Sequence, residues 1–258
     1  MKIFVLVKEV PDTYGDRKLN LETGLADRAA GDVVLDEITE RALEVALSYA
    51  DKNDGTEVVA VSMAPEGSTA SVRRALAIGS GSAVHIADEQ LAGADLGLTA
   101  EVLAAAIRRG DPDLVITGNL STDGSGGVIP AMLAEHLGFA QATALTSVEI
   151  TADGVSGTRG ADAGSQPVSA ALPAVISITE ALPDARFPNF KGIMAAKKKP
   201  LEVLSLADLD VSADPAAAPR TIITAVSEKP PRAAGVKITD EGDAADKLVE
   251  YLVQNRLV

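Results

Sequence analysis

Apolar and polar positions alternate along the chain up to residue 137 in a way that predicts strands and helices in turn. Short continuous apolar runs are typical of buried strands, and they occur at residues 2–7, 57–62, 83–86 and 114–117. Between them, apolar side chains recur every three or four residues, as in helices with one buried face. These helices are expected at residues 36–53, 65–78, 96–109 and 125–137. Because strand–helix–strand units make right-handed crossovers, the pattern predicts a doubly wound, mostly parallel α/β sheet with helices on both faces.

The pattern changes after the last of these helices. Two alternating stretches flank a turn at residues 152–154 and predict a β-hairpin, and the apolar run 172–178 predicts another buried strand. Residues 182–200 are expected to be irregular. Residues 221–226 are compatible with a strand, and residues 243–255 with a terminal helix.

Three regions follow from these changes in composition. Residues 1–206 are expected to form one α/β domain, which includes the segment 186–199. Residues 207–219 have the composition of a linker, and residues 220–258 resemble an arm rather than part of the main core. The polar connection 8–35 is long enough that we expect it to serve a function.

Composition and charge narrow the class of protein. The chain has 258 residues, 47% of them apolar, so it can bury a sizeable core. Its net charge of −14 makes it a poor candidate for binding nucleic acid. It contains no cysteine, which excludes thiol catalysis and cysteine-ligated metals. No apolar run is long enough to span a bilayer or to form a signal sequence, so we expect a soluble, cytoplasmic protein without membrane insertion.

Catalytic motifs are missing from the sequence. The chain has two histidines, His85 and His136, and neither has an evident chemical partner in the sequence. There is no HExxH motif, nucleophile elbow, Walker A motif or GxGxxG after a strand. The sequence therefore predicts no catalytic residue and no metal site, and it does not look like a hydrolase or a transferase.

A loop rich in glycine follows the predicted strand 114–117. It reads GNLSTDGSGGV at residues 118–128, so it supplies hydroxyl and amide side chains together with four glycines. Glycine lets backbone N–H groups approach a ligand, and the next helix would direct its N-terminal dipole at the same place. The loop is typical of an anion site with a phosphate-bearing ligand. A tight strand–helix turn without a ligand is the alternative.

A second unusual segment, RFPNFKGIMAAKKKP, spans residues 186–200. Phe187, Phe190, Ile193 and Met194 are apolar side chains among turn residues, and three lysines follow at 197–199. Exposed phenylalanine and methionine on a loop indicate a protein contact. The alternative is a loop that folds back on its own core with solvated lysines.

These features occur within a longer series of stretches that resembles one family. In chain order the stretches are VLVKEVPDT, VLDEITERALEVAL, VVAVSMAP, RRALAIGSGSAVHI, DLVITGNLSTDGSGGVIPAMLAEHLG, LPAVISITE, FKGIMAAKKKPLEVL and PPRAAGVKITDEG. The chain resembles the β subunit of electron transfer flavoprotein over nearly its whole length. The resemblance implies an adenine-nucleotide-hydrolase-like fold with a C-terminal arm that packs on an α subunit.

The resemblance also implies two nucleotide cofactors. The heterodimer would carry FAD, bound mostly by the α subunit and approached by Thr13 and Tyr14 of this chain. The β subunit would bind a structural AMP. By resemblance the AMP pocket and its phosphate loop comprise Leu6, Asp36, Met63, Gly118, Asn119, Ser121, Thr122, Asp123, Gly124, Ser125, Gly126, Gly127 and Val128.

The family's partners complete the expectation. Such a subunit is an electron carrier, not an enzyme, which takes electrons from flavin dehydrogenases such as those of fatty acid oxidation and passes them to a quinone oxidoreductase. The segment 186–199 would dock on the dehydrogenase, with Phe190 at the position of an apolar anchor that is often leucine in the family. The implied partner-binding residues are Arg186, Phe187, Phe190, Lys191, Ile193, Met194 and Lys197.

Two further interpretations remain open from the sequence. In electron-bifurcating relatives a second FAD takes the place of AMP, and the glycine-rich loop suits either ligand. A stand-alone protein that binds an adenine nucleotide, as an enzyme or as a regulatory module, is the other, with Asp36 and Asp123 as the candidate catalytic groups. Such a protein would leave the segment 186–199 unexplained.

Overall fold

The computed structural model describes residues 1–15, 17–216, 220–232 and 234–258. The chain divides into two compact units, Met1–Thr224 and Ala225–Val258. The first unit therefore continues past the linker expected at residues 207–219. Residues 217–219 of that linker lie outside the described residues.

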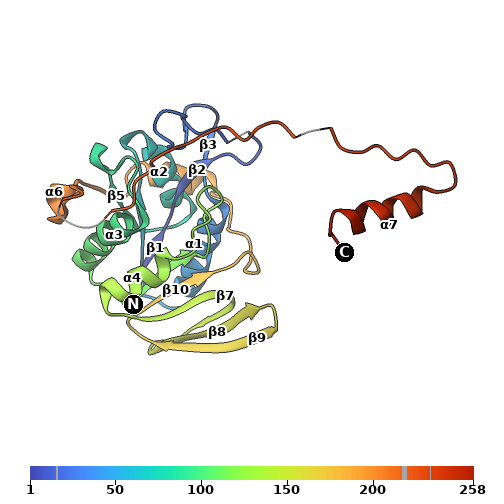
Figure 1. Ribbon diagram of the computed structural model, residues 1–258. Helices are drawn as coiled ribbons and strands as arrows, with labels where there is room; N and C mark the ends of the chain where they lie inside the picture. Colours follow the sequence, from blue (N-terminus) through green and yellow to red (C-terminus); the bar gives the residue numbers. More distant parts are fainter. Residues whose placement is uncertain (16, 217–219, 233) are drawn as a thin grey trace. The chain divides into compact units, whose positions relative to one another are not determined.

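The first unit is built on a nine-stranded sheet (Figure 1). Its order is β11-β5-β4-β1-β6-β10-β7-β8-β9, and neighbouring strands run parallel from β11 to β7. At one end of the sheet, β8 pairs antiparallel with β7 on one side and with β9 on the other. The strands span Lys2–Leu6 (β1), Glu57–Met63 (β4), Ser82–Ile86 (β5), Leu114–Gly118 (β6), Ala140–Ile150 (β7), Gly154–Ala161 (β8), Gly164–Ala171 (β9), Ala174–Ile178 (β10) and Leu201–Leu204 (β11). The mostly parallel sheet expected from the sequence is confirmed.

Helices cover both faces of this sheet. Helices α1 (Glu37–Ala50) and α2 (Thr69–Ile78) pack on one face, and α3 (Leu96–Gly110), α4 (Ile129–Leu137) and α6 (Leu206–Leu209) pack on the other. Strand β1 contributes side chains to the cores on both faces of the sheet, because alternate side chains of a strand point to opposite faces. Ile3 and Val5 join the core beneath α1 and α2, whereas Phe4 joins the core beneath α3.

Two helices differ from the expectation. The helix expected from residue 125 begins only at Ile129, because Ser125 and Gly127 have φ angles of 50° and 67°, which no α-helix accommodates. Within residues 182–200, expected to be irregular, Phe190–Ala196 forms α5. Asn189 caps this helix by accepting a hydrogen bond from the Gly192 N–H at 2.8 Å.

Four strands, β9 among them, were not expected, and one expected strand is absent. The connection 8–35 contains a small antiparallel sheet of β2 (Glu9–Pro11) and β3 (Val33–Leu35). Strand β11 pairs with β5 at the sheet edge, a pairing that depends on the chain crossing back from residue 200. Residues 221–226, compatible with a strand in sequence, adopt none.

The second unit contains α7 (Ala244–Gln254), at the position of the expected terminal helix. Apolar side chains on it, including Leu248, Val249 and Val253, are exposed by half or more. Among the helices of the described residues, none has both the length and the apolar content needed to cross a membrane.

Candidate functional site

The site lies at the carboxyl ends of the central strands, at the point where the chain changes the direction in which it adds strands to the sheet. From β1 the chain proceeds outward to β4 and β5 and then returns to pair β6 on the opposite side of β1. Ligands of doubly wound sheets bind beyond the carboxyl ends of the strands at such a switch point. Leu6, Met63 and Gly118 occupy the last positions of β1, β4 and β6.

The glycine-rich loop leaves β6 at this point. Its first amide, that of Asn119, donates to the carbonyl of Ile178 at the end of the neighbouring β10, at 2.9 Å. Its last residue, Val128, precedes α4 and has no side-chain acceptor with which to cap that helix. Gly124 to Val128 are all exposed. The first-turn amides of α4 therefore face the loop with their dipole available to an anion.

Asp36 is the most deeply buried polar side chain of the site, with an exposed fraction of 1%. Its Oδ2 accepts hydrogen bonds from the Thr122 amide at 2.8 Å and from the Thr122 hydroxyl at 3.3 Å. Its Oδ1 is buried and has no partner among the described residues. Burial raises the pKa of this carboxyl, against the effect of the Thr122 hydrogen bonds. Since buried acceptors are almost always satisfied, the free oxygen indicates a place for a ligand's hydrogen-bond donor.

Two positively charged side chains, Lys8 and Arg28, also contact the glycine-rich loop. They were not singled out from the sequence. Lys8 Nζ lies 2.7 Å from Asp123 Oδ1 and 3.2 Å from Ser121 Oγ. Arg28 Nη2 lies 3.8 Å from Asp123 Oδ2. Burial would raise the pKa of Asp123, but the hydrogen bond and charge of Lys8 outweigh it and hold that pKa below its ordinary value. Lys8 lies two residues after the end of β1, and this position was the available signal in the sequence.

The N-terminal connection lies against the same loop. Arg17 donates from Nη1 to the carbonyl of Thr122. Thr13 and Tyr14, expected near a flavin, are exposed, and Tyr14 is exposed completely. A cavity of about 290 Å³ lies under this turn, lined by Pro11, Asp12, Tyr14, Gly15, Arg17, Lys18, Asp27, Ala30, Gly31 and Asp32. The structure thus brings the two expected nucleotide-facing regions of the chain into contact.

The apolar segment 186–197 is far from this loop in sequence and has a different character. Phe187 and Phe190 are 90% and 79% exposed, and Ile193 and Met194 are each nearly half exposed. Lys191 and Lys197 are exposed as well. Arg186 is not free, since its guanidinium pairs with Glu44 and Asp51 of this chain. Four apolar side chains on one short stretch form an exposed patch of the kind that marks protein contacts.

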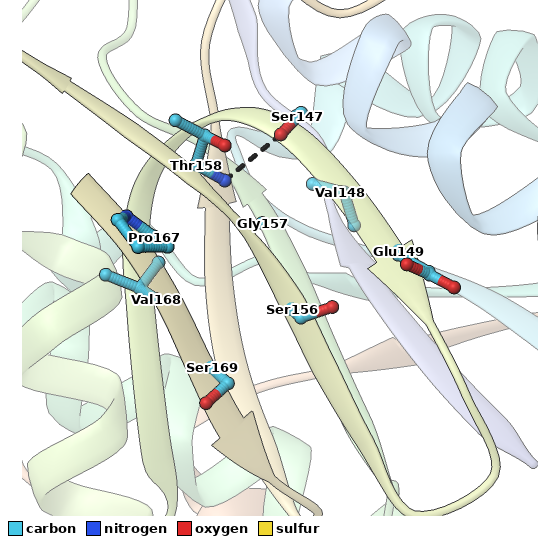
Figure 2. A pocket seen from close by; sticks show the side chains of 9 residues that line it. All are labelled: Ser147, Val148, Glu149, Ser156, Gly157, Thr158, Pro167, Val168 and Ser169. Carbon is cyan, nitrogen blue, oxygen red and sulfur yellow. Dashed lines mark hydrogen bonds between the residues drawn. The ribbon is translucent and has the colours of Figure 1, made fainter. Parts of the chain in front are cut away.

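A larger trough of about 570 Å³ lies on the curved face of β7, β8 and β9, away from the expected site (Figure 2). Its lining residues are Ser147, Val148, Glu149, Ser156, Gly157, Thr158, Pro167, Val168 and Ser169. The Thr158 amide donates to Ser147 Oγ at 3.1 Å across its wall. Glu149 is the one ionisable side chain of this lining, so the trough offers no positively charged side chain to a phosphate.

Neither histidine has a site around it. His85 is buried in β5, with Nε2 3.1 Å from the carbonyl of Ala64. His136 lies in the last turn of α4. The described residues contain no group of three or more acidic or histidine side chains placed to hold a metal ion.

Comparisons with known proteins agree on one family. Residues 23–209 match the model of the electron transfer flavoprotein domain. The chain is 44% identical to the electron transfer flavoprotein subunit beta of Mycobacterium bovis and 33% identical to that of Syntrophomonas wolfei. These alignments cover 99% and 98% of this chain and 99% and 96% of the relatives. The chain is also 28% identical to the caffeyl-CoA reductase-Etf complex subunit CarD of Acetobacterium woodii, over the full length of both.

The family model covers the region from β3 to β11 that carries the glycine-rich loop and the exposed patch, and the first two relatives match nearly end to end. This chain therefore belongs to the electron transfer flavoprotein family, as a β subunit.

Proposed function

We propose that this chain is the β half of a heterodimeric electron carrier rather than an enzyme in its own right. Membership of the β-subunit family is the observation that carries the proposal. The site chemistry is consistent with it, because the loop region offers the hydrogen-bond donors and acceptors of a binding site. In this role the chain binds an α subunit, and the pair carries FAD that accepts electrons from flavin dehydrogenases and donates them to a quinone oxidoreductase. Acyl-CoA dehydrogenases of fatty acid oxidation are the proposed donors, and the cytoplasm the proposed location.

The ligand proposed for the glycine-rich loop is AMP. The exposed residues 126–128, which follow the two amides that are bonded within the loop, and the N-terminus of α4 suit its phosphate. The unpartnered Oδ1 of Asp36 would accept a hydrogen bond from a hydroxyl or amino group of the nucleoside part. Leu6 and Met63, at the ends of β1 and β4, would supply apolar contact beside it. The types of residue present therefore suit a nucleoside monophosphate.

Thr13 and Tyr14 are proposed to lie near the FAD of the α subunit. Both are exposed on the turn that follows β2, and this turn rests on the glycine-rich loop through Arg17. The FAD itself would be held mostly by the partner chain. This chain would contribute a rigid wall, since β2 is fixed by the Glu9 carboxylate, which accepts hydrogen bonds from Ser68 and Ser71 at 2.6 Å each.

The proposed dehydrogenase contact is the apolar patch of Phe187, Phe190, Ile193 and Met194. Aromatic and methionine side chains are favoured at the centres of protein interfaces, and exposed lysines at the rim steer an encounter. Lys191 and Lys197 provide such charges on a protein of net charge −14. Phe190 is the proposed apolar anchor of the set.

A second candidate function is favoured by one comparison. The relative CarD is named as a subunit of a caffeyl-CoA reductase-Etf complex, and it aligns over the full length of this chain. In the alternative, the glycine-rich loop holds a second FAD in place of AMP, and the heterodimer bifurcates electrons. The loop chemistry suits either ligand, because both carry a phosphate next to an adenosine.

One experiment separates these functions. The chain is produced together with its α subunit, the visible spectrum of the complex is recorded, and the nucleotides released on denaturation are quantified by mass spectrometry. One FAD and one AMP per heterodimer support the proposed carrier. Two FAD and no AMP establish the bifurcating type. A chain without flavin that does not bind the α subunit would contradict both and favour a stand-alone nucleotide-binding protein.

A further inference from the structure

Three of the four patch residues, Phe190, Ile193 and Met194, lie on a helix that cannot be stable by itself. Helix α5 has seven residues, far short of the length at which an isolated helix persists in water. Its Phe190 and Met194, one helical turn apart, are exposed rather than packed. The conformation of the patch must therefore be maintained by contacts between this segment and the rest of the protein.

At the N-terminal end, Arg186 is bound to helix α1. Its Nε and Nη2 lie 2.8 Å from Glu44 Oε2 and Oε1, which is a bidentate pair, and its backbone N–H donates to the same carboxylate at 3.0 Å. Nη2 also lies 2.8 Å from Asp51 Oδ2 at the end of α1. Bidentate pairs fix orientation as well as distance. The chain immediately before Phe187 is thereby fastened to α1.

At the C-terminal end, Lys199 is bound to helix α2. Its Nζ donates to the carbonyls of Leu76 and Ser80 at 2.9 and 2.7 Å, so it satisfies groups that the end of α2 leaves free. Arg73 of α2 donates back to the carbonyl of Ala196, the last residue of α5, at 2.8 Å. These contacts fasten the chain immediately after the patch.

Between these two points, α5 lies directly against α2. A Cβ atom added at Gly192 would come within 2.6 Å of the Ala77 carbonyl oxygen, so only glycine permits this approach. Lys197 and Lys198 are exposed beside it, whereas Lys199 turns its ammonium group into the protein. Of the three lysines at residues 197–199, Lys199 is thus bound within the protein, and Lys197 and Lys198 face solvent.

We propose that Arg186 and Lys199 are positioning residues that hold the patch of Phe187, Phe190, Ile193 and Met194 in its docking conformation before a partner binds. The inference rests on the proposed docking function of this patch. A segment ordered in advance avoids the entropy cost of ordering it in the complex, and this lowers the partner concentration needed for binding. Arg186 and Lys199 act through α5 and need not contact the partner.

The experiment uses the complete αβ heterodimer with Lys199→Met, and with Lys198→Met as its matched control. Both changes remove one positive charge from the same run, but only the first removes the contacts to α2. Arg186→Met is paired with Arg74→Met, since Arg74 pairs α2 with Glu40 of α1 without touching the segment. Hydrogen exchange of the amides of residues 193–196 is measured first. The KM and kcat for flavin reduction by an acyl-CoA dehydrogenase and its acyl-CoA substrate are measured second.

We expect amide exchange in α5 to become about tenfold faster in Lys199→Met and Arg186→Met, because each loses charge-assisted hydrogen bonds that hold an end of the segment. KM for the carrier should rise about fivefold or more, with kcat and the flavin spectrum unchanged. Both controls should behave as the unmodified complex. If Lys199→Met does not assemble, Arg186→Lys, which keeps the charge but loses the bidentate pair, should show the same changes at smaller size.

Two results would overturn the proposal. Unchanged exchange in both Lys199→Met and Arg186→Met would show that neither residue orders α5. An equal rise of KM in Lys198→Met would show that the charge, not the positioning, matters. Failure of the docking function itself has a different signature, because Phe190→Ala would then leave KM unchanged while exchange in Lys199→Met still accelerates.

Discussion

The Lys8 ammonium lies 2.7 Å from the Asp123 carboxylate, although 115 positions separate the two residues in the chain. The pair joins the end of β1 to the middle of the glycine-rich loop. Asp36 joins the start of α1 to the same loop through Thr122. The carboxylates of Asp36 and Asp123 therefore both hold the glycine-rich loop in place. Their pKa values shift in opposite directions, so their contributions to stability depend on pH in opposite ways.

Asp123→Asn should lower the free energy of unfolding at neutral pH by about 1 kcal/mol, because it removes a charge-assisted hydrogen bond whose lysine is partly exposed. The pKa of Asp123 is lowered in the folded state, so the stabilisation is present above the pKa of the unfolded chain and is lost as the pH falls through the folded value. Urea denaturation of the αβ complex from pH 7 downward measures the difference. Asp54→Asn, at an exposed position, is the control, and a difference that does not shrink with falling pH would contradict the assignment.

Asp36→Asn should show the opposite trend. Burial raises the pKa of Asp36, so its contribution is fully present below the pKa of the unfolded chain and is lost as the pH rises through the folded value. Stability of the unmodified complex relative to Asp36→Asn should therefore increase as the pH falls. The same urea series measures it. Parallel curves for the two proteins at all pH values would show that Asp36 titrates normally.

Gly127→Ala should impair the loop, whereas Gly124→Ala should not. Gly127 has a φ of 67°, and a Cβ there would lie 2.6 Å from Leu120 Cδ2. A Cβ at Gly124 would meet its nearest neighbour, Ser121 Oγ, at 3.5 Å, an ordinary contact. We expect Gly127→Ala to cost about 1 kcal/mol or more and to reduce the nucleotide released from the purified complex. Equal nucleotide content in both variants would argue against a ligand at this loop.

Removal of residues 225–258 should abolish binding of the α subunit and leave the first unit folded. Thr224 ends that unit, and the chain just before it is fixed by Arg220 to Glu101 at 2.9 Å and by the Thr221 amide to Asp95 at 2.6 Å. Helix α7 buries none of its side chains, so its apolar residues are free for a partner. Copurification with a tagged α subunit measures the effect. A truncated chain that still copurifies would contradict the role of the arm.

Leu248→Asp tests the same arm without shortening it. Leu248 is half exposed on α7, so the change should cost little stability in this chain. A charge placed in an apolar interface should weaken α-subunit binding by about tenfold or more. Glu250→Lys, at an exposed position of the same helix, is the matched control for altered charge. Equal binding by all three proteins would show that this position of α7 does not contact the partner.

Much of the fold and part of the candidate site follow from local sequence. The apolar runs of β1, β4 and β6 and the periodic faces of α1 and α3 are local patterns, because side-chain direction in strands and helices repeats over a few residues. The glycine-rich loop was equally visible, since glycine marks places where the backbone turns or approaches something closely. Its residues lie at the carboxyl ends of the strands, as a doubly wound sheet requires.

The tertiary structure decided what local patterns do not encode. Strand β11 becomes a strand by pairing with β5, and α5 becomes a helix through its Asn189 cap and its contacts with α2. Lys8 meets Asp123, and Arg186 meets Glu44, only after the crossovers bring distant segments together. The sequence by itself thus determined the order of the main strands and helices as far as α4, and the glycine-rich loop that is proposed to bind a nucleotide. The fold decided which charges are committed within the chain and which remain free for a partner, because ion pairs depend on distance in space and not on spacing along the chain.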